Sequence, residues 1–357
     1  MRAALALARR SLGRTWPNPA VGCVIVRDGR VLARGRTQDG GRPHGEADAI
    51  ANASGSLKGA TVYVTLEPCS HAGRAGPCAD ALIGAGVARV VSAMQDPDPK
   101  VNGGGHARLE ASGIAVEIGE GAAEAAEINA GFLMRVRHGR PLFHLKIASS
   151  LDGHTATANG ESKWITGAAA RADGHRLRAS HDAILVGAKT VAADDPDLTC
   201  RLPGLERYSP VRIVLDSKGA LPLESRLVKT AREVPLWLVC TDIDAQREYF
   251  LREAGVEIVK VTAKDRRVDV AAAAQELGKR GLTRVLVEGG ATVAAAFLKA
   301  DLVDRLTVYR AGLLMGGDSR SAIAALGLVG LDFAPRFNLV STGVVGGDTL
   351  ETWRKAS

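Results

Sequence analysis

One histidine and two cysteines constrain this chain most, because each is expected at or just before the start of a helix. His44 directly precedes the helical segment GEADAIANA, Cys69 follows the β-branched strand TVYVTL, and Cys78 precedes the short helical segment ADALIGAG. One imidazole and two thiolates are good zinc ligands, and the dipole at a helix N-terminus favours the thiolate form of cysteine. The sequence therefore predicts a fold that brings these three segments together around one metal ion.

The carboxylate of Glu46 suggests what such an ion would do. Three protein ligands leave a fourth zinc position open for water, which is the catalytic pattern. Glu46 lies two residues after His44, and on a helix that offset turns its side chain away from the ligand direction and over the metal-bound water. Zinc lowers the pKa of such a water towards about 7, and a carboxylate can carry its proton to a leaving amine. The alternative is a structural site with His71 as fourth ligand, in which a carboxylate over the metal has no use.

Composition favours a globular protein of two domains that acts on a small anion. The 357 residues are 46% hydrophobic and 24% charged, which is ordinary for globular proteins. Aromatic residues make up only 4%, which argues against a stacking platform for single-stranded nucleic acid. The net charge of +7 is spread along both halves of the chain, which suits a phosphate ester better than nucleic acid.

The compartment is expected to be the cytoplasm. No apolar run reaches the ~18 residues of a membrane span, and the opening MRAALALARR is a poor signal peptide and a fair amphipathic helix. Five cysteines at irregular spacing argue against a disulfide framework and for a reducing environment. We interpret Cys23, Cys200 and Cys240, which lie in or near apolar strands, as core residues.

Strands and helices alternate along the chain, which indicates sheets covered by helices on both faces. In the first part we expect helices at 1–13, 45–53, 79–86 and 121–137, and strands at 21–26, 30–35, 61–66, 89–94 and 115–119. Asp28-Gly29 supplies the tight turn of a β-hairpin between the first two strands. In the second part we expect helices at 168–180, 244–254, 270–280 and 291–300, and strands at 142–148, 183–187, 211–217, 236–240, 284–290 and 305–312. Segments 201–210 and 316–335 are rich in loops.

The zinc-ligand pattern resembles that of the zinc-dependent nucleoside deaminases, whose signature is H-x-E…P-C-x-x-C. Here eight residues, rather than two, separate Cys69 and Cys78. That spacing, in EPCSHAGRAGPC, is similar to the bifunctional deaminase/reductase family of riboflavin biosynthesis. Further motifs resemble the same family in the same order: PNPAVGCVIVRDG, YVTLEPCSHAGR, GVARVVSAMQDPDPKVNGGG, KIASSLDGHTA, GESKWIT, LVGAKTVAADDPDLT and VEGGATVAAAF.

The resemblance implies an α/β fold with two parts. Residues 1–140 would form a cytidine-deaminase-like three-layer α/β/α domain, and residues 141–357 a dihydrofolate-reductase-like α/β domain, with the boundary at His138-Gly139-Arg140-Pro141. In the first domain His44, Cys69 and Cys78 would bind one zinc ion and Glu46 would be catalytic. Asn18 and His71 would contact the substrate. The sequence departs from the family at Gly45, where alanine is usual, and at Thr37, where many members have histidine.

The resemblance also implies an NADPH site in the second domain. By itself, the strand–Gly-Gly–helix pattern of VEGGATVAAAF is also compatible with an ordinary tight turn, and GxGxxG is absent. The family's cofactor positions fall on Ala148, Trp164, Thr190, Asp194, Ser217, Gly290, Ala291, Thr292, Val293, Ala294, Ala295 and Ala296. Its substrate positions fall on Ser162, Arg178, Leu198, Arg201 and Glu288. Without the resemblance, Arg178 could equally be a solvated helix charge.

The implied function is two consecutive reactions. The first is hydrolytic deamination of 2,5-diamino-6-(5-phosphoribosylamino)pyrimidin-4-one, and the second is NADPH-dependent reduction of the ribosyl group of the product to ribityl. Phosphorylated pyrimidines would be the only partners besides further copies of the chain, as a dimer or tetramer, with no nucleic acid or membrane. Two other interpretations are a nucleoside- or tRNA-editing deaminase with an unrelated C-terminal domain, and a zinc-stabilised scaffold without catalysis. The balanced charge argues against the first, and Glu46 against the second.

Overall fold

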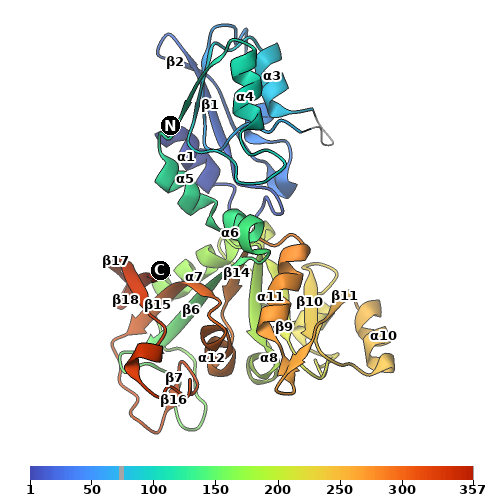
Figure 1. Ribbon diagram of the computed structural model, residues 1–357. Helices are drawn as coiled ribbons and strands as arrows, with labels where there is room; N and C mark the ends of the chain where they lie inside the picture. Colours follow the sequence, from blue (N-terminus) through green and yellow to red (C-terminus); the bar gives the residue numbers. More distant parts are fainter. Residues whose placement is uncertain (72–75, 357) are drawn as a thin grey trace. The chain divides into compact units, whose positions relative to one another are not determined.

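The computed structural model describes residues 1–71 and 76–356, and the chain divides into two compact units (Figure 1). The N-terminal unit is Met1–Gly139 and the C-terminal unit is Arg140–Ser357. The middle of the motif between Cys69 and Cys78 lies outside the described residues. No helix of the described residues is both long and apolar enough to cross a membrane.

The N-terminal unit is built on a five-stranded sheet in the order β2-β1-β3-β4-β5. Its strands are β1 (Gly22–Arg27), β2 (Arg30–Arg36), β3 (Thr61–Val64), β4 (Arg89–Ser92) and β5 (Ala115–Ile118). β1 runs antiparallel to β2 and β3, whereas β3, β4 and β5 are mutually parallel. The predicted hairpin is confirmed: Asp28 and Gly29 form its turn with positive φ angles of 52° and 71°.

Helices cover both faces of this sheet, as predicted. They are α1 (Arg2–Arg9), α2 (Gly45–Ala51), α3 (Cys78–Gly84), α4 (Gly104–Ala111), α5 (Ala122–Ile128) and α6 (Ala130–His138), with a 3-10 turn η1 (Asp39–Gly41). Figure 1 shows α1 and α5 on one side of the strands and α3 and α4 on the other. Buried aliphatic side chains from the strands and helices, such as Val62, Leu82 and Val90, form the core between these layers.

Two helix predictions for this unit need correction. The single helix expected over 121–137 is two helices that meet at Asn129, whose backbone has a φ of −93° and a ψ of 15°. The Asn129 side chain bonds the backbone of Ala20: Oδ1 accepts from the N–H at 2.8 Å and Nδ2 donates to the carbonyl at 3.1 Å. The helix expected over 1–13 ends at Arg9. In addition α4, which begins in a run of glycines, was not predicted.

The C-terminal unit contains a nine-stranded sheet in the order β11-β10-β9-β8-β14-β6-β15-β18-β17. Its strands are β6 (Leu142–Ser150), β8 (Ala183–Gly187), β9 (Val211–Leu215), β10 (Leu236–Cys240), β11 (Val256–Lys260), β14 (Arg284–Val287), β15 (Val303–Ala311), β17 (Phe337–Val345) and β18 (Asp348–Lys355). The strands from β11 to β15 are parallel; β18 is antiparallel to β15, and β17 is in turn antiparallel to β18. The carboxyl ends of the parallel strands therefore share one edge, where open α/β sheets bind ligands.

Helices alternate with these strands as predicted. They are α7 (Ala168–Ala179), α8 (Ala188–Asp194), α9 (Arg226–Lys229), α10 (Ala245–Glu253), α11 (Val270–Lys279) and α12 (Ala291–Lys299). Short elements complete the unit: β7 (His154–Ala156), β12 (Ala263–Lys264), β13 (Arg267–Val268), β16 (Arg320–Ser321), η2 (Glu206–Tyr208) and η3 (Leu331–Phe333). The strands β11, β17 and β18 and the helices α8 and α9 were not predicted from the sequence.

Candidate functional site

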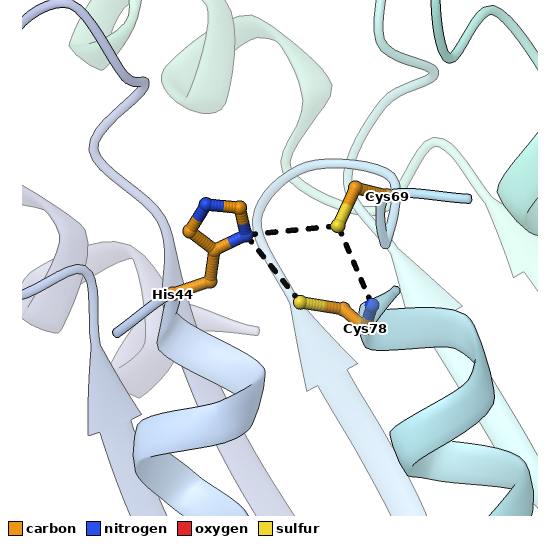
Figure 2. Close-up of side chains that lie close together, drawn as sticks. All are labelled: His44, Cys69 and Cys78. Carbon is orange, nitrogen blue, oxygen red and sulfur yellow. Dashed lines mark hydrogen bonds between the residues drawn. The ribbon is translucent and has the colours of Figure 1, made fainter. Parts of the chain in front are cut away.

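The side chains of His44, Cys69 and Cys78 meet in the N-terminal unit (Figure 2). His44 caps α2 and Cys78 is the first residue of α3. Nδ1 of His44 lies 3.6 Å from Sγ of Cys69 and 3.5 Å from Sγ of Cys78. Cys69 does not lie at a helix start as expected; it is in the loop after β3, and its sulfur accepts the N–H of Cys78 at 3.4 Å. The N-terminus of α3 therefore supplies an N–H donor to the sulfur of Cys69.

This geometry fits zinc. Tetrahedral zinc with bonds of about 2.3 Å to sulfur and about 2.0 Å to nitrogen places the nitrogen about 3.5 Å from each sulfur. The three ligand atoms all lie within 4.8 Å of one another, and no other histidine, cysteine or carboxylate of the described residues belongs to this group. Three ligands leave one coordination position open, which is the arrangement of catalytic rather than structural zinc sites.

The thiols of Cys69 and Cys78 interact with each other, and their pKa values are shifted in opposite directions. The hydrogen bond from Cys78 lowers the pKa of Cys69 to about 4. The same bond and burial near Glu46 raise the pKa of Cys78 far above its ordinary value. Cys78 therefore holds its proton more strongly than Cys69, and a metal that binds both sulfurs must displace that proton.

Glu46 is the catalytic candidate beside the ligands. It is the second residue of α2 and only 3% exposed. Burial, which disfavours the charged carboxylate, raises its pKa to about 7. Such a group can both accept and donate a proton near neutral pH. Glu46 lines a cavity of about 220 Å³ together with His44 and Cys69.

The predicted substrate residues of this unit lie on the same cavity. Asn18 and His71 both line it, and Asn18 donates from Nδ2 to the carbonyl of Gly41 at 2.9 Å. His71 is exposed and is not in the group of ligand atoms. The cavity wall continues through Asp96, Asp98 and Lys100, which sequence reasoning did not single out.

Both departures from the family pattern have a local explanation. Thr37 borders the cavity, but its hydroxyl accepts from the N–H of Val21 at 2.9 Å and donates to the carbonyl of Pro19 at 3.0 Å. It therefore clamps the chain that leads into β1. A Cβ on Gly45 would lie 2.8 Å from the carbonyl oxygen of Val21, so an alanine there would require a small shift of the same chain.

Glu67 is a buried carboxylate that the sequence did not mark as important. Its oxygens accept the backbone N–H groups of Asp96, Gly103, Gly105 and His106 at 2.8–3.3 Å. It therefore caps α4 and ties the loop that lines the cavity to the segment that carries Cys69. The glycine run at 103–105 was the available signal, since a Cβ at 105 would lie 1.8 Å from the carbonyl oxygen of Pro68.

In the C-terminal unit the residues predicted to bind a cofactor gather along the carboxyl edge of the parallel strands. Ala148 is near the end of β6, and Ser217 follows β9. Thr190 and Asp194 are on α8, directly after β8, and the segment 290–296 caps and begins α12, directly after β14. Since β8 and β14 are neighbours in the sheet, the two helices start side by side at this edge.

Small residues keep this edge open to a ligand's phosphate. A Cβ on Gly289 would lie 2.5 Å from Cα of Val186, so only glycine allows the two strand ends to approach. At the start of α12 the N–H groups of Ala291 and Thr292 precede the first hydrogen bonds of the helix, in which the N–H groups of Val293 and Ala294 donate to the carbonyl of Gly290. These residues suit a phosphate-bearing cofactor.

A second cavity, of about 250 Å³, brings both predicted ligand classes together. It is lined by Ala148 and Trp164, which were predicted for the cofactor, and by Ser162, Arg178, Arg201 and Glu288, which were predicted for the substrate. Lys146, Arg171 and His175 also line it. Leu198, Thr190, Asp194, Ser217 and the 290–296 segment are not part of the described lining. The arginine Arg171 stacks on the ring of Trp164 with 4.5 Å to its centroid.

A buried ion pair between Arg178 and Glu288 lies in the wall of this cavity. Arg178 contacts both carboxylate oxygens of Glu288, at 2.8 and 2.9 Å, and Nζ of Lys146 lies 3.7 Å from the same carboxylate. Burial raises the pKa of Glu288, but the charges of Arg178 and Lys146 outweigh it and hold the pKa at about 2. Arg178 is therefore not the solvated helix charge of the alternative interpretation.

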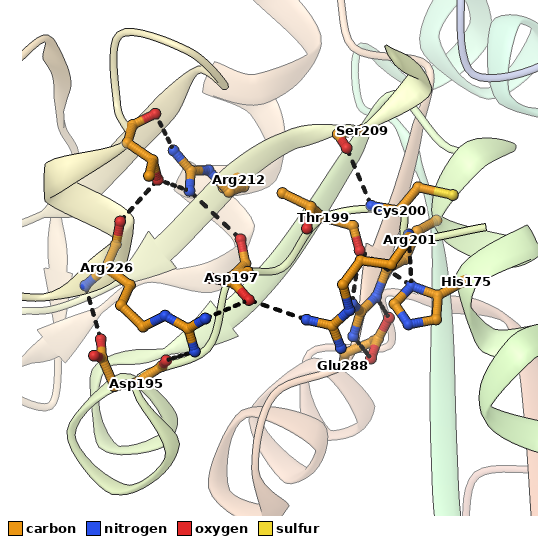
Figure 3. A network of polar contacts seen from close by, with 12 residues as sticks. His175, Asp195, Asp197, Thr199, Cys200, Arg201, Ser209, Arg212, Arg226 and Glu288 are labelled. Carbon is orange, nitrogen blue, oxygen red and sulfur yellow. Dashed lines mark hydrogen bonds and ion pairs between the residues drawn. The ribbon is translucent and has the colours of Figure 1, made fainter. Parts of the chain in front are cut away.

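Arg201 reaches the cavity from an irregular segment. Its guanidinium contacts Oδ2 of Asp197 at 3.0 Å, and Arg226 contacts the same oxygen at 2.9 Å (Figure 3). The backbone N–H of Arg201 donates to Nδ1 of His175 at 3.2 Å. Neither Asp197 nor His175 was predicted as a site residue, because each acts on Arg201 through contacts that spacing does not reveal.

Comparison with known proteins accounts for both halves of the chain. Residues 1–94 match the cytidine and deoxycytidylate deaminase zinc-binding region, and residues 141–350 match the RibD C-terminal domain. The second match is inconsistent with an unrelated C-terminal domain. The riboflavin biosynthesis protein RibD of Escherichia coli (strain K12) is 44% identical over 359 residues, which cover 98% of this chain and 96% of the relative. That of Bacillus amyloliquefaciens is 41% identical and covers 98% and 93%.

Two solved structures extend the similarity to the fold. RibD of Acinetobacter baumannii is 38% identical with a TM-score of 0.90, covering 100% of this chain and 98% of that one. The Thermotoga maritima protein is 34% identical with a TM-score of 0.87, covering 100% and 97%. It is described as a diaminohydroxyphosphoribosylaminopyrimidine deaminase/5-amino-6-(5-phosphoribosylamino)uracil reductase.

Proposed function

The chain belongs to the RibD family of bifunctional riboflavin biosynthesis enzymes, and from that membership we propose which reactions and residues each of its domains contributes. Residues 1–140 would deaminate 2,5-diamino-6-(5-phosphoribosylamino)pyrimidin-4-one. Residues 141–357 would then reduce the ribosyl group of 5-amino-6-(5-phosphoribosylamino)uracil to ribityl. Support comes from the two substrates for which the Thermotoga maritima relative is described and from the separate cavity in each unit.

In the deaminase domain, His44, Cys69 and Cys78 would hold zinc, which when bound supplies a water of lowered pKa. Glu46 would take a proton from the attacking water and give it to the departing ring amine. Its buried carboxylate, with a pKa of about 7, beside three converging ligand atoms is the observation that carries this assignment. Asn18 and His71, which line the same cavity, would orient the pyrimidine.

In the reductase domain, NADPH would supply hydride to the anomeric carbon of the substrate's sugar. Ala148, Trp164, Thr190, Asp194, Ser217 and residues 290–296 would hold the cofactor along the carboxyl edge of the sheet. Ser162, Leu198 and the Arg178–Glu288 pair would orient the sugar. Arg201 would bind its phosphate, because a planar guanidinium matches phosphate oxygens in pairs.

The test of this function uses the purified full chain and both half-reactions. We expect about one zinc ion per chain by atomic emission, ammonia release from the diaminopyrimidine substrate, and NADPH oxidation on the deaminated substrate alone. Limited proteolysis near 139–141 should yield fragments that retain zinc and NADPH binding, respectively. Zinc in the chain without ammonia release would contradict the deaminase assignment, and NADH oxidation in preference to NADPH would contradict the cofactor.

We also propose that the chain works as a homo-oligomer in a reducing cytoplasm. β17 is an edge strand of the described sheet, with Leu339, Val340 and Val344 50%, 56% and 75% exposed. An apolar edge strand pairs readily with another strand, and a second copy of this chain offers the same edge. All five cysteines are free thiols. Light scattering should give a dimer or tetramer that Val344→Lys dissociates, and a monomeric wild type would refute the oligomer. Cell fractionation should place the activity in the cytoplasmic fraction, and activity found only outside that fraction would refute the compartment.

A further inference from the structure

Arg201 depends on its neighbours for its position, because no helix or strand holds it. It lies in the irregular segment that follows Asp195, and its side chain is 55% exposed. The ion pair with Asp197 is shared, since Arg226 contacts the same oxygen. Exposed ion pairs contribute little to ordering a side chain. If Arg201 binds a phosphate in one position, further contacts must hold its backbone in place.

The backbone just before Arg201 adopts a conformation that must be held from outside. Leu198 is 4% exposed and has a φ of 56°, in the left-handed region that non-glycine residues rarely adopt. Such a conformation persists only where surrounding contacts determine it. It turns the chain so that Thr199, Cys200 and Arg201 run alongside α7.

Two side chains one turn apart on α7 hold this stretch (Figure 3). Arg178 donates from Nη1 to the carbonyl of Thr199 at 3.0 Å. Nδ1 of His175 lies 3.2 Å from the N–H of Arg201 and 3.1 Å from the Thr199 carbonyl. One nitrogen can serve only one of these two, as acceptor or as donor.

The charges around His175 determine whether its Nδ1 accepts from the Arg201 N–H or donates to the Thr199 carbonyl. Burial and the nearby charges of Arg178 and Arg201 lower the pKa of His175, so its ring is neutral at neutral pH. The Thr199 carbonyl already accepts from Arg178, whereas the Arg201 N–H needs an acceptor. The Nδ1 lone pair therefore accepts the Arg201 N–H, with the ring proton on Nε2.

We propose that His175 is a positioning residue of the reductase site, which holds the backbone of Arg201 so that its guanidinium meets the phosphate of the sugar-phosphate substrate. The inference rests on the reductase function proposed above. It adds a residue that contacts the cavity shared by Arg178, Arg201 and Glu288. His175 acts through Arg201 and needs no contact with the reacting atoms.

The first test is calorimetric binding of ribose 5-phosphate to the full chain. His175→Leu removes the acceptor and should weaken binding about three- to tenfold, the range for one lost hydrogen bond. His175→Asn is the matched control, because Oδ1 of asparagine occupies the place of Nδ1 and accepts the same N–H; it should bind within about twofold of wild type. Equal binding by the two variants would overturn the proposal, as would wild type that reduces substrate yet does not bind ribose 5-phosphate.

The second test separates positioning from catalysis and from folding. His175→Leu should raise KM for the phosphorylated substrate by the same factor, with kcat and the KM for NADPH unchanged and a melting temperature matching His175→Asn. In an Arg201→Ala background it should cause no further loss, since both changes remove one function. A large fall in kcat, or additive losses, would contradict the proposal. Ribose 5-phosphate binding with no NADPH oxidation would instead refute only the reductase function.

Discussion

The two sites of this chain are built in opposite ways. In the N-terminal unit, three ligand atoms from His44, Cys69 and Cys78 lie within 4.8 Å of one another. In the C-terminal unit, the cavity draws on residues from Lys146 in β6 to Glu288 after β14, with cofactor candidates at other strand ends. A metal needs a few side chains of fixed chemistry, whereas a dinucleotide and a sugar phosphate are bound by many strand ends and backbone groups. The spacing of motifs in the sequence can therefore predict the first kind of site, whereas the second kind becomes apparent only from the fold.

The two sites also differ in what balances their charge. The paired sulfurs of Cys69 and Cys78 require a cation to become fully deprotonated. The carboxylate of Glu288 already has its cations in Arg178 and Lys146. Metal removal should therefore affect one unit only, and breaking the internal ion pair should affect the other only.

Removal of zinc should have the largest effect, confined to the N-terminal unit. A strong chelator, or Cys69→Ser, should abolish ammonia release. It should also lower the stability of that unit, by about 4 kcal/mol at zinc a thousandfold above its dissociation constant. Scanning calorimetry and NADPH oxidation on the same samples would check this. If NADPH oxidation fell in parallel with zinc content, the claim that the two sites function independently would be contradicted.

Arg178→Met should have the next largest effect, confined to the C-terminal unit. It leaves the Glu288 carboxylate buried with only Lys146 nearby, and breaking such a pair costs about 3 kcal/mol. Urea denaturation would measure it. The folded pKa of Glu288, about 2, lies below its ordinary value of 4.5, so the pair stabilises the fold above about pH 4.5 and its contribution is lost as pH falls towards 2. The penalty of the variant should shrink over that window.

A double variant sharpens this prediction. Adding Glu288→Gln to Arg178→Met removes the buried charge and should restore much of the lost stability. If the single variant cost under about 1 kcal/mol, solvent would already be screening the pair, and the contrast between the two units would disappear.

Arg201→Ala should have a smaller effect, limited to substrate binding. A charge-assisted hydrogen bond is worth about 1.5–3 kcal/mol, so KM for the phosphorylated substrate should rise tenfold or more. The NADPH constant and the deaminase rate should stay near wild type. With dephosphorylated substrate the variant and wild type should differ little. Weakened NADPH binding with an unchanged substrate constant would show that Arg201 belongs to the cofactor.

His71→Ala should have the smallest effect on the metal. His71 lines the cavity but is not in the group of ligand atoms, so zinc content should stay at about one per chain. Atomic emission on the dialysed variant would measure it, and deamination should fall through substrate binding alone. Loss of zinc would instead favour a structural zinc site in which His71 is the fourth ligand and no coordination position is open for water.

The parts of the fold that the sequence predicted are those with local causes. The Asp28-Gly29 hairpin and the β-branched strands follow from neighbouring residues, and so does the start of α2 after His44. The break between α5 and α6 does not: it falls at Asn129, whose side chain bonds Ala20, a residue distant in sequence. α4 depends likewise on the distant Glu67 carboxylate at its N-terminus. At the sites, motif spacing pointed to His44, Cys69 and Cys78, whose candidate ligand atoms meet in the structure, whereas His175 and Asp197 became visible only through their contacts with Arg201.

The most direct test of two independent sites is Glu46→Gln, with zinc content and both half-reactions measured on one preparation. The glutamine is isosteric and cannot carry the proton, so deamination should fall on the order of a hundredfold or more. Zinc should stay at about one per chain, because Glu46 is not in the group of candidate ligand atoms. NADPH oxidation with the deaminated substrate should match wild type. An emptied metal site, intact deamination or a matching loss of reduction would contradict the account.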